Sequence, residues 1–207
     1  MCSSDLYPRL ESCSSHLRVA AICKPARTVS GDYFDYVVAG QGQVALAVGD
    51  VAGKGISAAL LMASLQSSLR TQLQSAPDGS LSTSDIVSRV NRHLCASSTP
   101  DKYATFFLGI YDEPSNTLVY TNAGHVPPIL IRNGMAHRLE VDGTVVGAFP
   151  LVSYGQSSLT LEAGDLLVWF TDGVTEPESE FGEMFGEERL IDLLVKNAHR
   201  PEQEIVQ

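Results

Sequence analysis

Hydrophobic residues along this chain fall into short runs that glycine, proline and polar positions separate. The first 16 residues are polar and irregular, whereas runs rich in β-branched and aromatic residues begin at Leu17. Such runs are typical of strands. The first three predicted strands are Leu17–Cys23, Asp35–Ala39 and Val44–Val48. Because the last two flank Gly40-Gln41-Gly42, we expect them to form a hairpin.

Two segments show the spacing of helices instead. Residues 56–75 contain no glycine or proline, and leucines recur there every four residues, which predicts a largely buried helix. These leucines are Leu61, Leu65, Leu69 and Leu73. A second helix is predicted from Ser84-Asp85 to about Ala96, where one face carries apolar residues and Ser82, Thr83 and Ser84 can cap the start. The apolar residues are Ile86, Val90 and Leu94.

The strand pattern returns after the second helix. The further predicted strands are residues 103–111, 117–121, 129–131 and 164–170, and a third helix follows from Glu187 to about Ala198. Strands, two helices, strands and a helix in this order predict an α+β sandwich rather than regular βαβ alternation. We therefore expect mostly antiparallel sheets.

Composition narrows the class of protein. A chain of 207 residues fits one domain, and 44% hydrophobic with 18% charged residues is typical of a globular protein. The net charge of −10 disfavours nucleic acid and anionic membranes as partners. No apolar run is long enough to span a bilayer and the N-terminus lacks a signal-peptide pattern, so we expect a cytoplasmic protein. The four cysteines show no zinc-site spacing and are expected to be thiols.

Three aspartates stand where predicted strands end in glycine-containing turns. They are Asp32 in Ser30-Gly31-Asp32-Tyr33-Phe34-Asp35, Asp50 in Gly49-Asp50-Val51-Ala52-Gly53-Lys54-Gly55, and Asp172 in Thr171-Asp172-Gly173-Val174-Thr175-Glu176. Hard divalent cations prefer carboxylate and carbonyl oxygens, and they offset the repulsion between clustered acids. A single Asp-Gly pair is also compatible with an ordinary turn. The segment around Asp50 does not match a phosphate-binding loop, because only three residues separate its glycines and Gly55 follows the lysine.

These motifs together resemble the metal-dependent protein phosphatase (PPM, protein phosphatase 2C-like) superfamily, in its SpoIIE/RsbU-like bacterial branch. Pro25-Ala26-Arg27, Tyr103-Ala104-Thr105-Phe106-Phe107 and Asn122-Ala123-Gly124-His125-Val126-Pro127-Pro128 occur in the order of that branch. The resemblance covers about residues 17–195. It implies a four-layer α-β-β-α sandwich, in which helix pairs flank a central β-sandwich with two metal ions at one edge.

The resemblance also implies a ligand set and a reaction. Asp50 would bridge two Mn²⁺ or Mg²⁺ ions, the Val51 carbonyl would bind one, and Asp32 and Asp172 would bind the other or orient its waters. A water activated by the metals would then hydrolyse phosphoserine or phosphothreonine on a regulatory protein, such as an anti-sigma-factor antagonist. An upstream sensor or receiver domain is a further implied partner, and a homodimer is compatible with the sequence.

Several other residues are weaker candidates for the site. Arg27 and Lys54 are candidate phosphate contacts, although exposed basic residues are usually only solvated. His125 is a candidate general acid, but its place before two prolines favours fixing a turn by hydrogen bonds. Ala52 stands where some eukaryotic relatives have a histidine. Residues 142–156 form a long glycine-containing connection, which the resemblance identifies as a regulatory switch segment. The glutamates between Glu176 and Glu188 are either a cation-gathering cluster or a solvated surface.

One departure from the family pattern keeps alternatives open. Relatives end in a further strand whose Asp-Asp pair completes the metal site, and this sequence has no such pair after Asp192. We therefore expect residues 1–16 to be the end of an upstream linker and residues 17–207 to be a phosphatase domain that lacks its C-terminal strand. The alternatives are a catalytically weak phosphatase-like binding module and a metal-dependent hydrolase of small phosphoesters.

Overall fold

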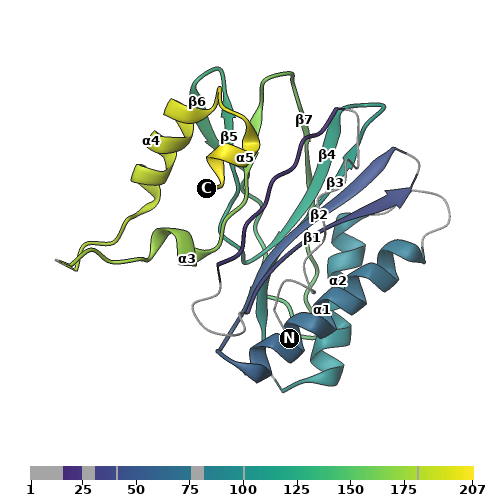
Figure 1. Ribbon diagram of the computed structural model, residues 1–207. Coiled ribbons are helices and arrows are strands. Elements are labelled where there is room, and N and C mark those ends of the chain that lie inside the picture. The colour runs from purple at the N-terminus through teal and green to yellow at the C-terminus, as the bar shows by residue number, and fades with distance from the viewer. Residues whose placement is uncertain (1–15, 25–30, 41, 76–81, 100, 181) are drawn as a thin grey trace.

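Two antiparallel β-sheets form the centre of the protein, and helices cover their outer faces (Figure 1). The computed structural model describes residues 16–207 except 25–30, 41, 76–81, 100 and 181. The larger sheet has the order β1-β2-β3-β4-β7, with bounds Asp32–Gly40, Gln43–Val51, Ala104–Asp112, Thr117–Ala123 and Ser157–Thr160. The smaller sheet has the order β6-β5-β8, with bounds Met135–Arg138, Ile129–Arg132 and Leu166–Val168.

Two helices pack on the outer face of the larger sheet. The first, α1 (Ile56–Gln74), buries all four leucines that recur every four residues, which confirms the prediction from their spacing. The second, α2 (Thr83–Ser97), begins at the N-cap Ser82, whose hydroxyl accepts a hydrogen bond from the Asp85 amide at 3.2 Å. Buried residues of α1, α2 and β1 to β3 form one apolar cluster. The helix pair thus covers the sheet that carries Asp32 and Asp50.

A second apolar cluster fills the space between the sheets. Phe107 of β3 stacks on Tyr120 of β4 at 5.6 Å between ring centroids and meets the edge of Trp169 at 6.2 Å. Leu130 of β5 belongs to the same cluster. On the far side, α4 (Glu187–Asn197) packs on the smaller sheet, and Ile205 of α5 (Glu202–Ile205) joins the third apolar cluster that α4 forms with β5. The four expected α-β-β-α layers are therefore present (Figure 1).

The predicted first strand is wrong. Residues 17–24 are described but form no strand. Leu17 and Val19 pack instead against the apolar cluster of Tyr36, Val44 and Leu46, so their alternating apolar pattern serves packing rather than a hydrogen-bonded ladder. The predicted hairpin is confirmed, because β1 and β2 pair antiparallel up to Gly40 opposite Gln43. Within the described residues, no helix is both long and apolar enough to cross a membrane.

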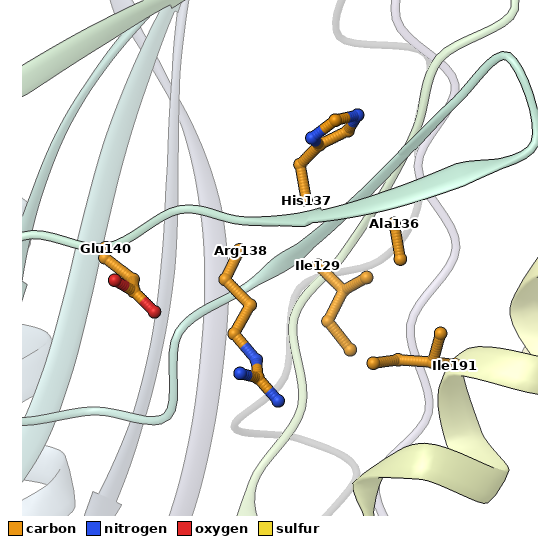
Figure 2. A pocket seen from close by; sticks show the side chains of 6 residues that line it. All are labelled: Ile129, Ala136, His137, Arg138, Glu140 and Ile191. Carbon is orange, nitrogen blue, oxygen red and sulfur yellow. The ribbon is translucent and has the colours of Figure 1, made fainter.

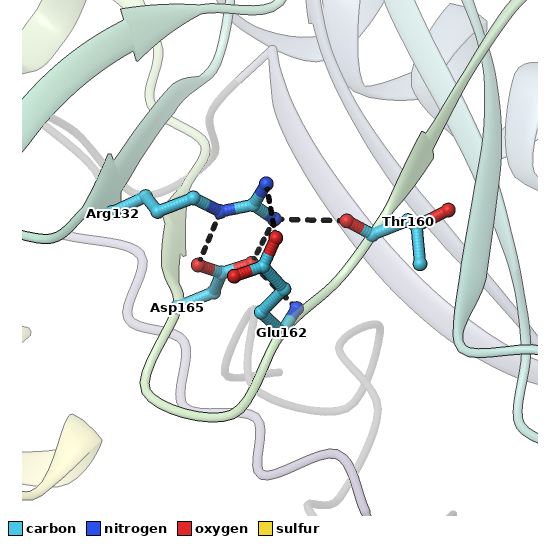
Figure 3. A network of polar contacts seen from close by, with 4 residues as sticks. All are labelled: Arg132, Thr160, Glu162 and Asp165. Carbon is cyan, nitrogen blue, oxygen red and sulfur yellow. Dashed lines mark hydrogen bonds and ion pairs between the residues drawn. The ribbon is translucent and has the colours of Figure 1, made fainter.

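Arg132 ties the two sheets together where the chain passes from one to the other (Figure 3). Its guanidinium donates from Nε to Asp165 at 2.8 Å and from Nη2 to the backbone carbonyl of Thr160 at 2.8 Å. Nη1 lies 3.0 Å from a carboxylate oxygen of Glu162. Because Thr160 ends β7 and Asp165 precedes β8, this network fixes the turn between them. Strand β8 then leads to α3 (Asp172–Thr175), which carries the third candidate aspartate.

Candidate functional site

Asp32 and Asp50 lie side by side at the open end of the β1–β2 hairpin. Asp32 is the register partner of Asp50, and side chains of directly opposed residues point to the same face of a sheet. Burial, together with the neighbouring carboxylates of Asp32, Asp172 and Glu176, raises the pKa of Asp50 to about 6. The pairing therefore holds like charges together at a cost in free energy.

The Val51 carbonyl lies beside this pair because residue 31 is a glycine. The Val51 amide donates to the Gly31 carbonyl at 3.3 Å. A Cβ on Gly31 would lie 2.8 Å from the Val51 carbonyl oxygen and 3.3 Å from Asp50 Oδ1. The Val51 side chain is buried, so only its backbone faces the site. Glycine at position 31 thus keeps two oxygens accessible that a larger residue would crowd.

The start of β3 supports the turn that follows Asp50. The Ala52 amide donates to the Tyr103 carbonyl at 2.9 Å, and Thr105 Oγ1 lies 3.5 Å from the Asp50 carbonyl oxygen. Gly53 and Gly55 have φ values of +105° and +77°, which L side chains rarely adopt, and they carry the chain into α1. Lys54 between them is exposed. The backbone at residues 50–52 is therefore fixed by contacts to the start of β3.

Asp172 approaches from a different element. It is the first residue of the four-residue helix α3 and is exposed, yet its carboxylate acts on Asp50 together with Glu176. The sequence leaves Glu176 either in a cation-gathering cluster or on a solvated surface, and its effect on Asp50 favours the first alternative for this residue. Within the described residues, no three His, Cys, Asp or Glu side chains already stand as a group that could hold a metal ion. The carboxylates are close enough to interact without forming a closed ligand set.

His125 has the turn-fixing role that its sequence position favours. Its amide donates to Asn122 Oδ1 at 2.7 Å, and Asn122 Nδ2 donates to its carbonyl at 2.9 Å. Its Nδ1 lies 2.8 Å from Thr105 Oγ1. Burial lowers the pKa of His125 to about 4, although the Phe170 backbone and the carboxylates of Asp172 and Asp32 oppose this. A neutral imidazole at pH 7 does not favour the alternative role of general acid.

Two further residues quoted in the motifs lie elsewhere or outside the description. Asp35 is buried and accepts hydrogen bonds from Arg70 Nε at 2.8 Å and Nη2 at 3.0 Å, and from the Tyr33 hydroxyl at 3.0 Å. It therefore joins β1 to α1 instead of entering the site. Arg27, the candidate substrate contact, lies outside the described residues.

Sequence reasoning gave no role to Gly31 or Thr105. Both lie in motifs that the sequence displays, but their effect depends on which backbone oxygens lie opposite them. Gly31 immediately precedes Asp32 in the sequence, and Thr105 lies opposite Asp50 in the sheet. Only the strand register could have identified them.

The chemistry of the oxygen donors fits a hard divalent cation. Asp32, Asp50 and Asp172 offer carboxylates and Val51 a backbone carbonyl, which are the ligands that Mg²⁺ and Mn²⁺ prefer. Burial and the neighbouring carboxylates both raise the pKa of Asp50, and a cation would neutralise the negative charge that gathers there. A cavity of about 650 Å³ lies elsewhere, between the β5–β6 hairpin and α4 (Figure 2). It is lined by Ile129, Ala136, His137, Arg138, Glu140 and Ile191, none of which is a candidate site residue.

Comparison with known proteins identifies the family. Residues 40–207 match the family described as Stage II sporulation protein E (SpoIIE). The chain belongs to the SpoIIE family. It is 33% identical over 168 residues to the phosphoserine phosphatase RsbU of Bacillus subtilis, covering 80% of this chain and 49% of RsbU. The chain spans between 18% and 49% of the length of the curated relatives it matches.

Solved structures of SpoIIE-like and phosphatase domains share the fold. The RsbU and RsbW domains of Rv1364c from Mycobacterium tuberculosis match with a TM-score of 0.70 and 27% identity, over 84% of this chain and 48% of that one. The catalytic domain of the serine/threonine phosphatase PstP, in complex with two manganese ions, matches with a TM-score of 0.63 and 18% identity, over 88% and 83% of the two chains. At 18% identity, the second likeness concerns the fold alone.

Proposed function

We propose that residues 17–207 form a metal-dependent protein phosphatase domain that hydrolyses phosphoserine or phosphothreonine on a regulatory protein. The observation that carries this proposal is the pairing of Asp32 with Asp50, beside the Val51 carbonyl that Gly31 leaves accessible. Family membership and the phosphoserine phosphatase activity named for RsbU support it. The activity is thus inferred from a site of suitable chemistry in a fold that phosphatases share.

Four residues would hold two divalent ions, Mn²⁺ or Mg²⁺. We assign Asp50 as the shared ligand, Val51 as a carbonyl ligand, and Asp32 and Asp172 as further carboxylates. When bound, such ions lower the pKa of a coordinated water and neutralise charge on a phosphate group. In this chain the backbone at Tyr103 holds the Asp50–Ala52 turn through the Ala52 amide. Thr105 and Asn122 in turn fix the ring and backbone of His125 beside the carboxylates.

The proposed substrate is a phosphorylated regulatory protein of the anti-sigma-factor antagonist type. The RsbU and RsbW domains named for the Mycobacterium tuberculosis protein support a place in such regulation. An upstream sensor or receiver domain is a further proposed partner. A phosphoserine peptide is therefore the first substrate to test.

The deciding experiment compares two substrates in one protein. Turnover of a phosphoserine peptide and of p-nitrophenyl phosphate is measured against Mn²⁺ concentration, with a chelator as the metal-free control. We expect Mn²⁺-dependent release of phosphate, with the peptide preferred. Faster turnover of p-nitrophenyl phosphate would favour a small-phosphoester hydrolase. Peptide binding without turnover would favour a phosphatase-like binding module.

A further inference from the structure

Asn91 on α2 is a fully buried polar residue that the proposed site does not use. It is 0% exposed. Its Oδ1 accepts a hydrogen bond from the Gly147 amide at 2.8 Å, and its Nδ2 donates to the Phe149 carbonyl at 2.8 Å. One amide group therefore fixes residues 147–149, in the long connection between β6 and β7, on the side of α2. Burying an amide requires that its polar atoms be paired, and here both are.

The residues that Asn91 holds lie directly against the start of β3. Val146 exchanges two backbone hydrogen bonds with Ala104, each 2.9 Å long, beyond the end of β4. Gly147 has a φ of +94°, and a Cβ there would lie 3.0 Å from the Lys102 carbonyl oxygen and 3.4 Å from the Tyr103 Cα. Segment 146–149 thus braces residues 102–104 from the side opposite β2.

The start of β3 in turn holds the turn that carries the candidate ligands. Ala104 is the register partner of Val51, and the Tyr103 carbonyl accepts from the Ala52 amide at 2.9 Å. Two sets of backbone contacts therefore connect segment 146–149 to the oxygens of residues 50 and 51. Asn91 is the side chain that fixes the outer end of this connection.

We propose that Asn91 is a positioning residue for the Asp50–Ala52 turn, acting through segment 146–149 and the start of β3. This inference rests on the proposed metal site, because its effect is expected on the affinity for the cation. Residues that support a ligand from behind typically change metal affinity by about 10- to 100-fold when they are replaced. A role confined to packing would change thermal stability alone.

Thr83 provides a matched control on the same helix. It is also 0% exposed, and its hydroxyl lies 2.9 Å from Thr121 Oγ1 and 3.3 Å from Gln156 Oε1. Gln156 lies at the other end of the long connection, away from the start of β3. Thr83→Val therefore removes one hydrogen bond of α2 to the same connection and one to β4, without touching the brace on residues 102–104.

Calorimetric titration with Mn²⁺ and thermal melts in chelator test the inference. We expect both Asn91→Ala and Thr83→Val to lower the melting temperature, but only Asn91→Ala to weaken Mn²⁺ affinity, by about tenfold. Affinity within twofold of the unmodified protein in Asn91→Ala would overturn the positioning role. Equal losses of affinity in the two variants would overturn it too, since they would indicate general destabilisation.

Hydrogen exchange of the unmodified protein gives a test that does not depend on a variant folding. Because coupling between two places is reciprocal, Mn²⁺ binding should slow exchange of the Gly147 amide, which Asn91 holds. The Asp85 amide, capped by Ser82 at the start of α2, should not change. Unchanged exchange at Gly147 despite Mn²⁺ binding would contradict the inference. Mn²⁺ binding and protection without phosphopeptide turnover would refute the proposed activity alone, whereas no Mn²⁺ binding would refute both.

Discussion

The two halves of the candidate site are built in different ways. The sheet half consists of Asp32, Asp50 and the Val51 carbonyl, and strand pairing and backbone hydrogen bonds fix all three. The α3 half consists of Asp172 and Glu176, which are exposed and stand on or next to a four-residue helix. The N-cap of that helix, Thr171, makes no capping hydrogen bond through its side chain.

This difference in construction predicts that the two halves contribute unequally to metal affinity. Asp50 is partly buried beside Asp32, where water screens the repulsion poorly, so a cation there relieves a large unfavourable interaction. Asp172 is solvated, and a cation gains less by approaching it. We therefore expect the sheet half to dominate metal binding and the α3 half to refine it.

The largest expected effect is that of Asp50→Asn. A neutral amide cannot supply the charge of a ligand shared by two ions, so turnover should fall by about a hundredfold or more while the fold is kept. A phosphopeptide assay with a Mn²⁺ titration measures this, and a far-ultraviolet circular dichroism spectrum checks the fold. Asp101→Asn, on an exposed aspartate outside the site, is the control. Turnover of the unmodified protein in Asp50→Asn would refute the shared-ligand role.

Gly31→Ala should weaken the sheet half without removing a ligand. The added methyl group would stand 2.8 Å from the Val51 carbonyl oxygen, so that carbonyl must move. We expect about a tenfold loss of Mn²⁺ affinity, the size typical of changes behind a ligand. Gly40→Ala, at the other end of β1, is the matched control, because its Cβ would come no closer than 3.6 Å to any atom. Equal affinity in the two variants would mean that the Val51 carbonyl is not a ligand.

The stability of the metal-free protein should depend on pH through Asp50. Its pKa of about 6 in the folded protein exceeds the ordinary aspartate value of 3.8, so the folded state binds the proton more tightly than the unfolded state does. This stabilisation is complete below pH 3.8 and is lost as the pH rises through 6. In chelator, the melting temperature should therefore fall between pH 5 and pH 7, and Asp50→Asn should reduce the fall. A melting temperature that rises over this range by the same amount in both proteins would contradict the assignment.

The smallest expected effects are on the thermal stability of the metal-free protein, where variants of the two halves should differ. Two like charges that face each other across paired strands repel by about 1 kcal/mol at an effective dielectric near 20. Asp32→Asn removes this repulsion, so it should raise the melting temperature in chelator by about 2–4 °C. Asp172→Asn should change it by less, because that carboxylate is exposed. Thermal melts of the two variants side by side measure the difference. A clear loss of stability in both would make these aspartates structural turn residues.

Regular elements with a buried face could be predicted from the sequence. The leucines of α1 recur every four residues because that face is buried, and β2 buries most of its positions. The strand β6 escaped prediction, since all four of its residues are exposed and none marks a face. The polar strand β7 was missed for a similar reason, because three of its four residues are exposed.

The candidate site likewise contains residues that the sequence could identify and residues that it could not. Glycine-flanked aspartates at strand ends, together with the resemblance, pointed to Asp32, Asp50 and Asp172. No local pattern could show that Thr105 lies opposite Asp50, or that Asn91 braces the start of β3 through Gly147, since both depend on pairing between distant segments. The contribution of Glu176 likewise depends on where α3 ends relative to β2. The assignments of Arg27 and of the ligands themselves stay predictions.

The β1–β2 hairpin also has a consequence for the kinetics of folding. Its turn lies between Gly40 and Gln43, and Asp32 opposite Asp50 is the register pair farthest from it. A hairpin that closes from its turn forms this pair of like charges last, and it opens there first. A cation that binds after Asp32 and Asp50 have paired would stabilise that end of the hairpin. We therefore expect Mn²⁺ to slow unfolding more than it accelerates folding, as contacts absent from the transition state do.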